Sequence, residues 1–322
     1  MSLDPAVAAV RLAVRRDLAD VGDHDVLVAC SGGADSLALL AATVFEARAQ
    51  TWRVIGVSVD HGLQDGSTEH TDHVVAQMAR LGVDETVAAR VTVESGGRGI
   101  EAAAREARYA VLEEVAQRLG SRVVLLGHTL DDQAETVLLG LTRGSGGRSI
   151  AGMRPTFDDF RRPLLDITRE QTETACRAEG IEWWEDPHNA DPRFTRSRVR
   201  HTVLPMLERE LGPGVAETLA RTAGQLRRDM EALDRLAAAS HAELDDVSGL
   251  LLKDLHQLDL AIASRVLRLA ALDAGAPASE LFHVHVASLV ALAEAELSGE
   301  VQLPGKVTAF RSGGRLQFRP TT

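Results

Sequence analysis

The sequence predicts an α/β protein in which a doubly wound, mostly parallel sheet is followed by a smaller helical domain. Through the first half of the 322 residues, short apolar runs alternate with longer segments of helical periodicity, which is the pattern of βαβ units. After a Leu-Gly-Pro-Gly turn at 211–214 the sequence becomes rich in Ala, Leu and Arg, with helical character throughout. We therefore expect two domains, at 1–205 and 206–322.

Each strand of the first domain is predicted from a short apolar run, and each helix from apolar residues at helical spacing. The predicted strands are 25–30, 53–59, 86–93 and 122–127. The predicted helices are 35–48, 67–81, 100–119, 131–142 and 168–179.

The second domain is predicted to be helical to about residue 297. Its last segment, 300–318, contains short strand-like pieces around Pro304-Gly305 and Gly313-Gly314. We expect these pieces to form a tail after the helices.

The charged residues exclude some kinds of catalytic site and argue against some binding partners. The net charge of −12 argues against indiscriminate binding to nucleic acid or anionic membranes, which depends on clustered positive charge. Only two of the 35 basic residues are lysines, Lys253 and Lys306. A Schiff-base lysine or a P-loop lysine is therefore excluded from the first 252 residues.

The cysteines and the hydropathy pattern favour a soluble, cytoplasmic protein with no membrane segment. Cys30 and Cys176 are too few and too far apart in sequence to predict a disulfide framework or a cysteine-rich zinc site. The sequence has no apolar run of about 18 residues and no signal-like segment at its N-terminus.

The strongest local signal is the loop Ser31-Gly32-Gly33-Ala34-Asp35-Ser36, between a predicted buried strand and a predicted helix. Glycines let the backbone approach a ligand closely, and the N-terminus of the following helix favours an anion. This pattern indicates a phosphate-binding loop that needs no lysine. The alternative is a β-turn in which Ser31 and Asp35 cap the helix.

Two histidines follow later strands at the predicted carboxyl edge of the sheet, where open α/β folds bind ligands. His61 follows the second strand, and Gly127-His128 follows the fourth. A ligand contact and a structural role in the loop both remain open for His61.

Carboxylates gather directly after His128. Asp131, Asp132 and Glu135 fall in the first turns of a predicted helix, with Asp132 and Glu135 on one face. Such a cluster suits Mg²⁺ or a cationic substrate group, whereas acidic residues in a first turn also complement the helix dipole.

Arginines recur in three later segments. Arg105 and Arg108 lie at helical spacing, Arg143 precedes a glycine loop, and 193–210 contains five arginines against two glutamates at 208 and 210. Clustered arginine near aromatic residues suits contacts to phosphate and single-stranded bases, although a solvated charged helix explains such a run equally well.

The loop Ser31–Ser36 resembles the PP-loop of the N-type ATP pyrophosphatases, which bind the pyrophosphate of ATP and release it while adenylating a substrate. Together with the later motifs, in this order and spacing, residues 22–205 resemble the tRNA(Ile)-lysidine synthetase family. The motifs are 31–36, 61–63, 101–109, 128–136, 143–146, 162–165 and 185–200. The last motif departs from the family pattern at Ser197, where Asn is usual.

The resemblance implies a PP-loop ATP-pyrophosphatase domain with the adenine nucleotide alpha-hydrolase-like fold, and a two-step reaction. ATP adenylates O2 of the wobble cytidine in a CAU-anticodon isoleucine tRNA and releases pyrophosphate. The side-chain amine of L-lysine then attacks C2 and displaces AMP. The implied cofactors are ATP and Mg²⁺, and a homodimer is consistent with the family.

The resemblance also implies roles for individual residues. ATP would contact Ser31, Gly32, Gly33, Ala34, Asp35, Ser36, His61, Gly127 and His128, with Asp35 also the Mg²⁺ ligand. The catalytic set is Asp35, Arg108, Asp132, Glu135 and Arg196. The substrate-binding set is Arg105, Asp131, Asp132, Glu135, Arg143 and Arg200. The tRNA footprint is expected at 143–162 and 193–200, with 206–322 as a further tRNA-binding domain.

Two other functions remain open at this point. Another PP-loop tRNA-modifying enzyme, such as a thiolation enzyme, would need reactive thiolates, and neither cysteine has a partner nearby in sequence. A non-catalytic RNA-binding adaptor would not need Asp35, Asp132 and Glu135, which are all present.

Overall fold

The computed structural model describes 3–60, 67–91, 100–143, 146–186, 190–244, 248–294 and 299–321, without the side chains of 100–104 and 143. The chain forms two compact units. Unit 1 comprises Met1–Arg143 and Gly152–Ala223, and unit 2 comprises Gly144–Ala151 and Gly224–Thr322.

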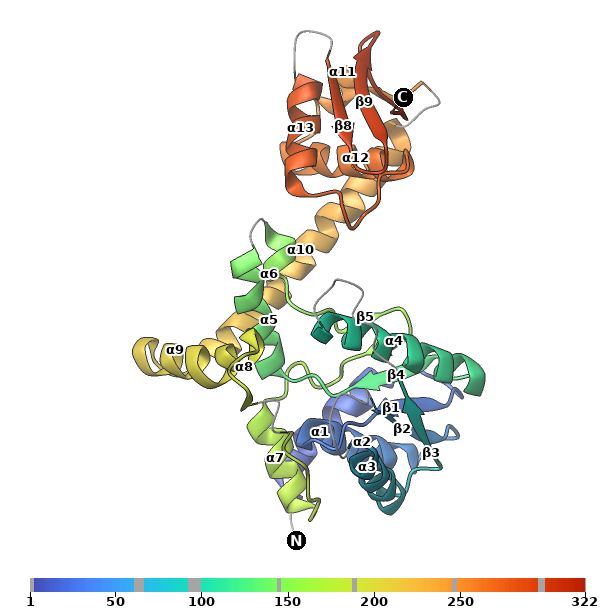
Figure 1. The fold of residues 1–322 in the computed structure, drawn as a ribbon, viewed down its shortest axis with the longest axis vertical. Helices are drawn as coiled ribbons and strands as arrows, with labels where there is room; N and C mark the ends of the chain where they lie inside the picture. Colours follow the sequence, from blue (N-terminus) through green and yellow to red (C-terminus); the bar gives the residue numbers. More distant parts are fainter. Residues whose placement is uncertain are drawn as a thin grey trace. The chain divides into compact units, whose positions relative to one another are not determined.

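A six-stranded sheet forms the centre of unit 1 (Figure 1). Its strands are β1 Val26–Ala29, β2 Val54–Asp60, β3 Glu85–Arg90, β4 Val123–Leu126, β5 Thr156–Phe157 and β6 Phe160–Arg161, in the order β3-β2-β1-β4-β6-β5. All pairs are parallel except β5 with β6, and Val28 of β1 lies in register with Gly56 and Leu125. The predicted, mostly parallel sheet is confirmed.

Helices cover both faces of this sheet. One face packs on α1 Pro5–Asp17, α2 Ala34–Ala47, α3 Ser67–Leu81 and α7 Arg169–Ala178, and the other packs on α4 Ile100–Leu119. Leu27 and Val28 are adjacent in β1, and they point into the two different cores, as the alternation of strand side chains requires. The doubly wound arrangement is therefore confirmed.

A helical layer completes unit 1. It contains α5 Leu130–Arg143, α8 Thr195–Arg198, the π-helix η2 Val199–Val203, α9 Leu204–Leu211 and the beginning of α10 Val215–Leu244. Ala134, Val199 and Leu204 form a small buried core between these segments. This packing holds α5 and η2 side by side.

The connectivity of the sheet creates a ligand-binding position. The chain runs from β1 outward to β2 and β3, and then returns to place β4 on the opposite side of β1. Such a reversal leaves an opening beyond the carboxyl ends of β1 and β4, where open α/β sheets bind their ligands. The loop 31–33 and the start of α5 follow these two strands directly.

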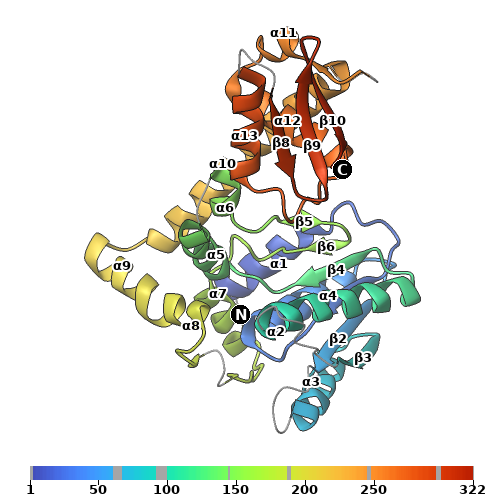
Figure 2. The same ribbon diagram turned by 45° about the horizontal axis from the view of Figure 1, so that its top comes forward.

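Unit 2 contains its own antiparallel sheet (Figure 2). The strands β7 Leu250–Leu251, β8 Glu300–Leu303, β9 Val307–Ser312 and β10 Arg315–Pro320 are ordered β7-β10-β9-β8. The helices of unit 2 are α6 Gly147–Ile150, the rest of α10, α11 Leu252–Leu255, α12 Leu260–Asp273 and α13 His283–Glu294. The strand-like pieces expected as a tail therefore share one core with α10, α11, α12 and α13.

The predicted domain boundary after residue 205 falls inside α9. Pro205 lies in the first turn of that helix, which follows directly on the π-helix 199–203. The two compact units separate later in the chain, between Ala223 and Gly224 within α10. The functional limits of the two domains stay a prediction. Across the described ranges, no helix is long and apolar enough to cross a membrane.

Candidate active site

The loop after β1 is held in shape by Ser36. The Ser36 hydroxyl donates to the carbonyl of Gly33 at 2.9 Å and accepts from the backbone N–H of Ser31 at 3.1 Å. Gly33 is the N-cap residue of α2, and no side chain of the described residues caps that helix. The capping alternative for Ser31 and Asp35 is therefore wrong, and the first N–H groups of α2 can face an anion.

The two glycines of the loop have different roles. Gly32 has φ +83°, and an added Cβ would lie 2.6 Å from Cγ2 of Val74 and 3.1 Å from Cε1 of His70. Gly33 has φ −79°, and among the described residues its added Cβ would meet only Oγ of Ser31, at 3.7 Å. Gly32 is thus required by the fold, whereas Gly33 leaves room for a ligand group to approach the backbone.

An aromatic pair that the sequence did not predict supports the outer side of this loop. His70 Nε2 lies 3.1 Å from the carbonyl oxygen of Ser31, and the N–H of Trp184 donates to the carbonyl of Gly32 at 3.0 Å. The centroids of the two rings are 3.9 Å apart. These contacts give the carbonyls of Ser31 and Gly32 hydrogen-bond partners within the protein.

Gly127 allows the end of β4 to approach α2. An added Cβ there would lie 3.1 Å from backbone atoms of Asp35 and Ser36. The structure thus gives this residue, predicted to contact ATP, a packing role that brings together the loops that follow β1 and β4.

The predicted carboxylates and two predicted arginines form an ion-pair cluster. Arg196 Nε donates to Glu135 Oε2 at 2.9 Å, and Arg200 Nε donates to Glu135 Oε1 at 2.6 Å. Arg200 also donates from Nη2 to Asp132 Oδ1 at 2.9 Å. The Glu135 side chain is fully buried, and the two guanidinium groups supply the partners that a buried carboxylate requires. Arg200 belongs to the π-helix, a form that occurs frequently at functional sites.

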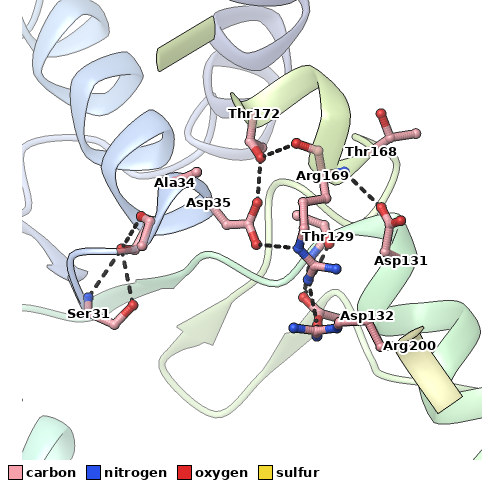
Figure 3. Close-up of polar contacts among 12 residues, drawn as sticks. Ser31, Ala34, Asp35, Thr129, Asp131, Asp132, Thr168, Arg169, Thr172 and Arg200 are labelled. Atoms are coloured by element: carbon pink, nitrogen blue, oxygen red, sulfur yellow. Dashed lines mark hydrogen bonds and ion pairs between the residues drawn. The ribbon is translucent and has the colours of Figure 1, made fainter. Parts of the chain in front are cut away.

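Arg169, which the sequence did not single out, joins this cluster to the phosphate loop (Figure 3). Its Nε lies 3.4 Å from Asp35 Oδ2, its Nη2 lies 3.2 Å from Asp132 Oδ1, and its Nη1 lies 3.8 Å from Glu135 Oε1. One guanidinium therefore contacts carboxylates from both sides of the opening between β1 and β4. Thr172 also donates to Asp35.

Local capping fixes Arg169 in place. Thr168 and Gln171 form a capping box at the start of α7, which puts Arg169 at the first helical position. Its backbone N–H donates to Asp131 Oδ2 at 2.7 Å. Asp131, predicted to bind substrate, thus also caps α7.

The environment shifts the pKa values of Asp35 and Asp132 in opposite directions. Burial raises the pKa of Asp35 to about 6, although Arg169 and Thr172 act against this shift. Burial also disfavours the charge of Asp132, but Arg169, His128 and Arg200 together lower its pKa to about 2. Asp132 is therefore a permanent anion near neutral pH, whereas Asp35 titrates close to it.

His128 lies beside the cluster as a neutral side chain. Burial lowers the pKa of His128 to about 3, and its Nδ1 accepts from Arg162 Nε at 3.3 Å. Arg162 is itself buried and donates to Tyr109 Oη at 3.2 Å. A role of His128 toward ATP stays a prediction.

The remaining predicted site residues lie on α4, at the start of α2, or outside the described residues. Arg105 and Arg108 are on α4, where the Arg105 guanidinium lies 5.6 Å from the ring centroid of Tyr109. His61 and the side chain of Arg143 lie outside the described residues. Ala34 begins α2 and is buried.

Several arginines of the predicted tRNA footprint are engaged within the protein. Arg161 pairs with Asp20 at 2.6 Å, Arg162 is buried, and Arg196 and Arg200 pair with Glu135. The footprint at 143–162 and 193–200 stays a prediction. Arg154, Arg193 and Arg198 of the same segments are exposed.

The residues of the loop fit the phosphates of ATP. The room at Gly33 and the N-terminus of α2 suit a phosphate group. Asp35, the predicted Mg²⁺ ligand, is engaged by Arg169 and Thr172 in this structure. Among the described residues, no group of three or more His, Cys, Asp or Glu side chains could hold a metal ion. The role of Asp35 toward Mg²⁺ stays a prediction.

The fold and the loop define this protein as a PP-loop protein, and the PP-loop domain family matches residues 8–207. A tRNA(Ile)-lysidine synthase from Streptomyces coelicolor is 47% identical, with 99% of each chain covered. One from Thermobifida fusca is 50% identical, with 97% of each chain covered. The chain belongs to the tRNA(Ile)-lysidine synthase family.

A solved structure shares the fold alone. The U34-tRNA thiolase NcsA from Methanococcus maripaludis, with its [4Fe-4S] cluster, matches with a TM-score of 0.58 and 18% identity. The match covers 69% of this chain and 79% of that chain.

Alanine at the two loop glycines should separate folding from ligand binding. Gly32→Ala should lower the free energy of unfolding by about 1–3 kcal/mol, because of its positive φ and the contact with Val74. Gly33→Ala should change stability by less than about 1 kcal/mol, yet weaken ATP binding at least tenfold. Urea denaturation and calorimetric titration with ATP measure the two effects. Equal loss of stability in both variants would contradict the distinction.

Asparagine at the two shifted carboxylates should have opposite effects on stability. At pH 7, Asp35→Asn should stabilise the fold by up to about 3 kcal/mol, because the raised pKa means that ionised Asp35 is unfavourable in the folded state. Asp132→Asn should destabilise it by about 2–5 kcal/mol, because buried guanidinium groups lose a partner.

The pH dependence of the stability difference between wild type and Asp35→Asn tests whether ionised Asp35 destabilises the fold. Well below the ordinary aspartate pKa of about 3.9, Asp35 is protonated in both states, so wild type and Asp35→Asn should be equally stable. As the pH rises from about 4 to about 6, the unfolded chain ionises first and wild type loses stability relative to the variant. Urea denaturation at several pH values measures this difference, and one that is constant from pH 4 to pH 7 would refute the assignment.

Proposed function

We propose that the protein ligates L-lysine to C2 of the wobble cytidine in CAU-anticodon tRNA-Ile, using ATP. In the first step, O2 of the cytosine attacks the α-phosphorus of ATP and pyrophosphate leaves. In the second step, the lysine Nε attacks C2, the C2–O2 bond breaks, AMP leaves with O2, and the amine loses a proton. The observation that carries the proposal is the ion-paired link between the phosphate loop and the carboxylate cluster through Arg169.

The loop 31–36 supports the first step. The N–H groups at the start of α2 and the room at Gly33 suit the phosphates of ATP, and no lysine is needed. Ser36 holds the loop conformation that makes these groups available. The developing negative charge would be stabilised by backbone amides and by the nearby Arg169 guanidinium.

The cluster supports the second step. Asp132 and Glu135 are carboxylates beside the opening, and they suit an ammonium group of lysine. With a pKa near 2, Asp132 is an anchor for a cation rather than a proton acceptor. Asp35, whose pKa is about 6, is the better matched group to accept a proton near neutral pH.

The buried thiols disfavour sulfur transfer. Cys30 and Cys176 are both buried, and burial raises the pKa of Cys176 to about 12. Burial also raises the pKa of Cys30. Both thiols are therefore protonated at neutral pH, whereas sulfur transfer requires a thiolate.

Incorporation of labelled lysine into tRNA tests the proposal. Incubation of the protein with ATP, labelled L-lysine and a CAU-anticodon tRNA-Ile transcript should place the label in a modified cytidine of the nucleoside digest. Asp35→Ala and Asp132→Ala should each reduce incorporation at least a hundredfold, because each removes a group from the link between the two half-sites.

The matched control is Glu173→Ala, which removes an exposed carboxylate paired with Arg177 on the same α7 helix. This variant should incorporate lysine at the wild-type rate. Full incorporation by both aspartate variants, or labelling only by another amine or a sulfur donor, would refute the proposed function.

Four further features belong to this proposal as expectations. Mg²⁺ would enter with the phosphates of ATP, which commonly supply most of its ligands. A homodimer, the cytoplasmic location and the tRNA-binding role of 206–322 also stay predictions.

A further inference from the structure

We propose that Arg169 makes the binding of L-lysine depend on ATP. Without nucleotide, Arg169 neutralises the carboxylates that lysine needs, and bound ATP releases them by attracting the guanidinium. Arg169 is thus a positioning residue that orders the two substrates. The inference rests on the proposed function, since it assumes that the loop 31–36 binds ATP and that the cluster receives lysine.

The ion-paired side chains of the cluster are balanced in charge. Three carboxylates face three guanidinium groups at 2.6–3.8 Å, and a further carboxylate, Asp131, accepts from the backbone N–H of Arg169. The members are Asp35, Asp132, Glu135, Arg169, Arg196 and Arg200. A neutral cluster offers little attraction to L-lysine, whose net charge is +1, and a fourth cation there would be repelled by the arginines.

Arg169 is the member of the cluster that lies next to the phosphate loop. Among the ion pairs of the described residues, Arg169 alone connects Asp35 of the loop with Asp132 (Figure 3), and it also contacts Glu135. Arg196 and Arg200 are instead tied to Glu135 by hydrogen bonds of 2.6–3.0 Å. Arg169 makes the longer contacts, at 3.2–3.8 Å, so its guanidinium is the one that the expected phosphates can draw away.

Phosphate competes with the carboxylates for this guanidinium. Arginine binds phosphate strongly because its planar donors match two oxygens at once. When Arg169 turns to the phosphates of ATP, the remaining cluster has one negative charge in excess. That charge matches the net charge of lysine, so each substrate strengthens the binding of the other by the same factor.

Equilibrium dialysis with labelled L-lysine tests this coupling in the full-length protein. Wild type should bind lysine at least tenfold more tightly with saturating α,β-methylene-ATP than without nucleotide, at constant Mg²⁺. Titration of the same analogue should show an equal gain in its affinity when lysine is saturating.

Substitutions of Arg169 separate the charge from the fold. Arg169→Gln should bind lysine without nucleotide within about threefold of the nucleotide-bound affinity. Arg169→Lys keeps the charge and should keep the dependence on nucleotide. The double variant Arg169→Gln/Asp35→Asn restores the charge balance and should again bind lysine weakly without nucleotide. Arg177→Gln, an exposed position on the same helix, should behave as wild type.

The outcomes distinguish this inference from the proposed function. If the protein forms the lysine adduct of tRNA but binds lysine equally with and without the analogue, the inference alone is overturned. Nucleotide dependence of the same size in wild type and a folded Arg169→Gln variant also overturns it. If no adduct forms under any condition, both proposals fail.

Discussion

The architecture of the site depends on the need to neutralise buried carboxylates. Glu135 is fully buried and Asp132 nearly so, and unpaired charges in such positions are strongly unfavourable. The partners come from two segments that are distant in sequence, the start of α7 and the run through α8 and the π-helix. The requirement for neutrality therefore holds α5, α7 and the π-helix around the opening between β1 and β4.

Close backbone contacts complete this arrangement. Gly127 lets the end of β4 approach the first turn of α2, and Gly32 lets the loop pack on α3. Side chains at either position would move the loop relative to the carboxylates. Gly33 has open space instead of a close contact. Within the described part of the chain, only the Ser31 hydroxyl lies near an added Cβ at this position. Gly32 and Gly127 are therefore required for packing within the protein, whereas Gly33 leaves space that a ligand can occupy.

Much of the catalytic unit was predictable because its signals are local. The helices 67–81 and 100–119 were predicted with the bounds observed, and the four longer strands agree within about two residues over the described range. The strands β5 and β6 have two residues each, which is too short for periodicity to detect. In 206–322 the strand-like pieces were recognised, but their pairing into a sheet is a long-range property.

The site residues also divide into those with a local sequence signal and those placed by long-range packing. Asp132 and Glu135 were predicted together because a three-residue spacing places them on one helix face. Arg169 was missed because its own segment resembles an ordinary helix start. The capping box of Thr168 and Gln171 was the available signal, since it fixes Arg169 in the first turn. Which carboxylates that turn faces depends on the packing of α7 against α2, and sequence spacing does not contain that information.

The use of arginine alone in this cluster has a chemical consequence. An adenylated cytosine is an electrophile, and it would react with any free amine held beside it. The cationic groups of the cluster are the guanidinium groups of Arg169, Arg196 and Arg200, and a guanidinium cation is not a nucleophile. With no lysine before residue 253, unit 1 contains no side-chain amine to intercept the activated base. The cationic groups of the cluster can therefore balance charge while remaining chemically inert toward the intermediate.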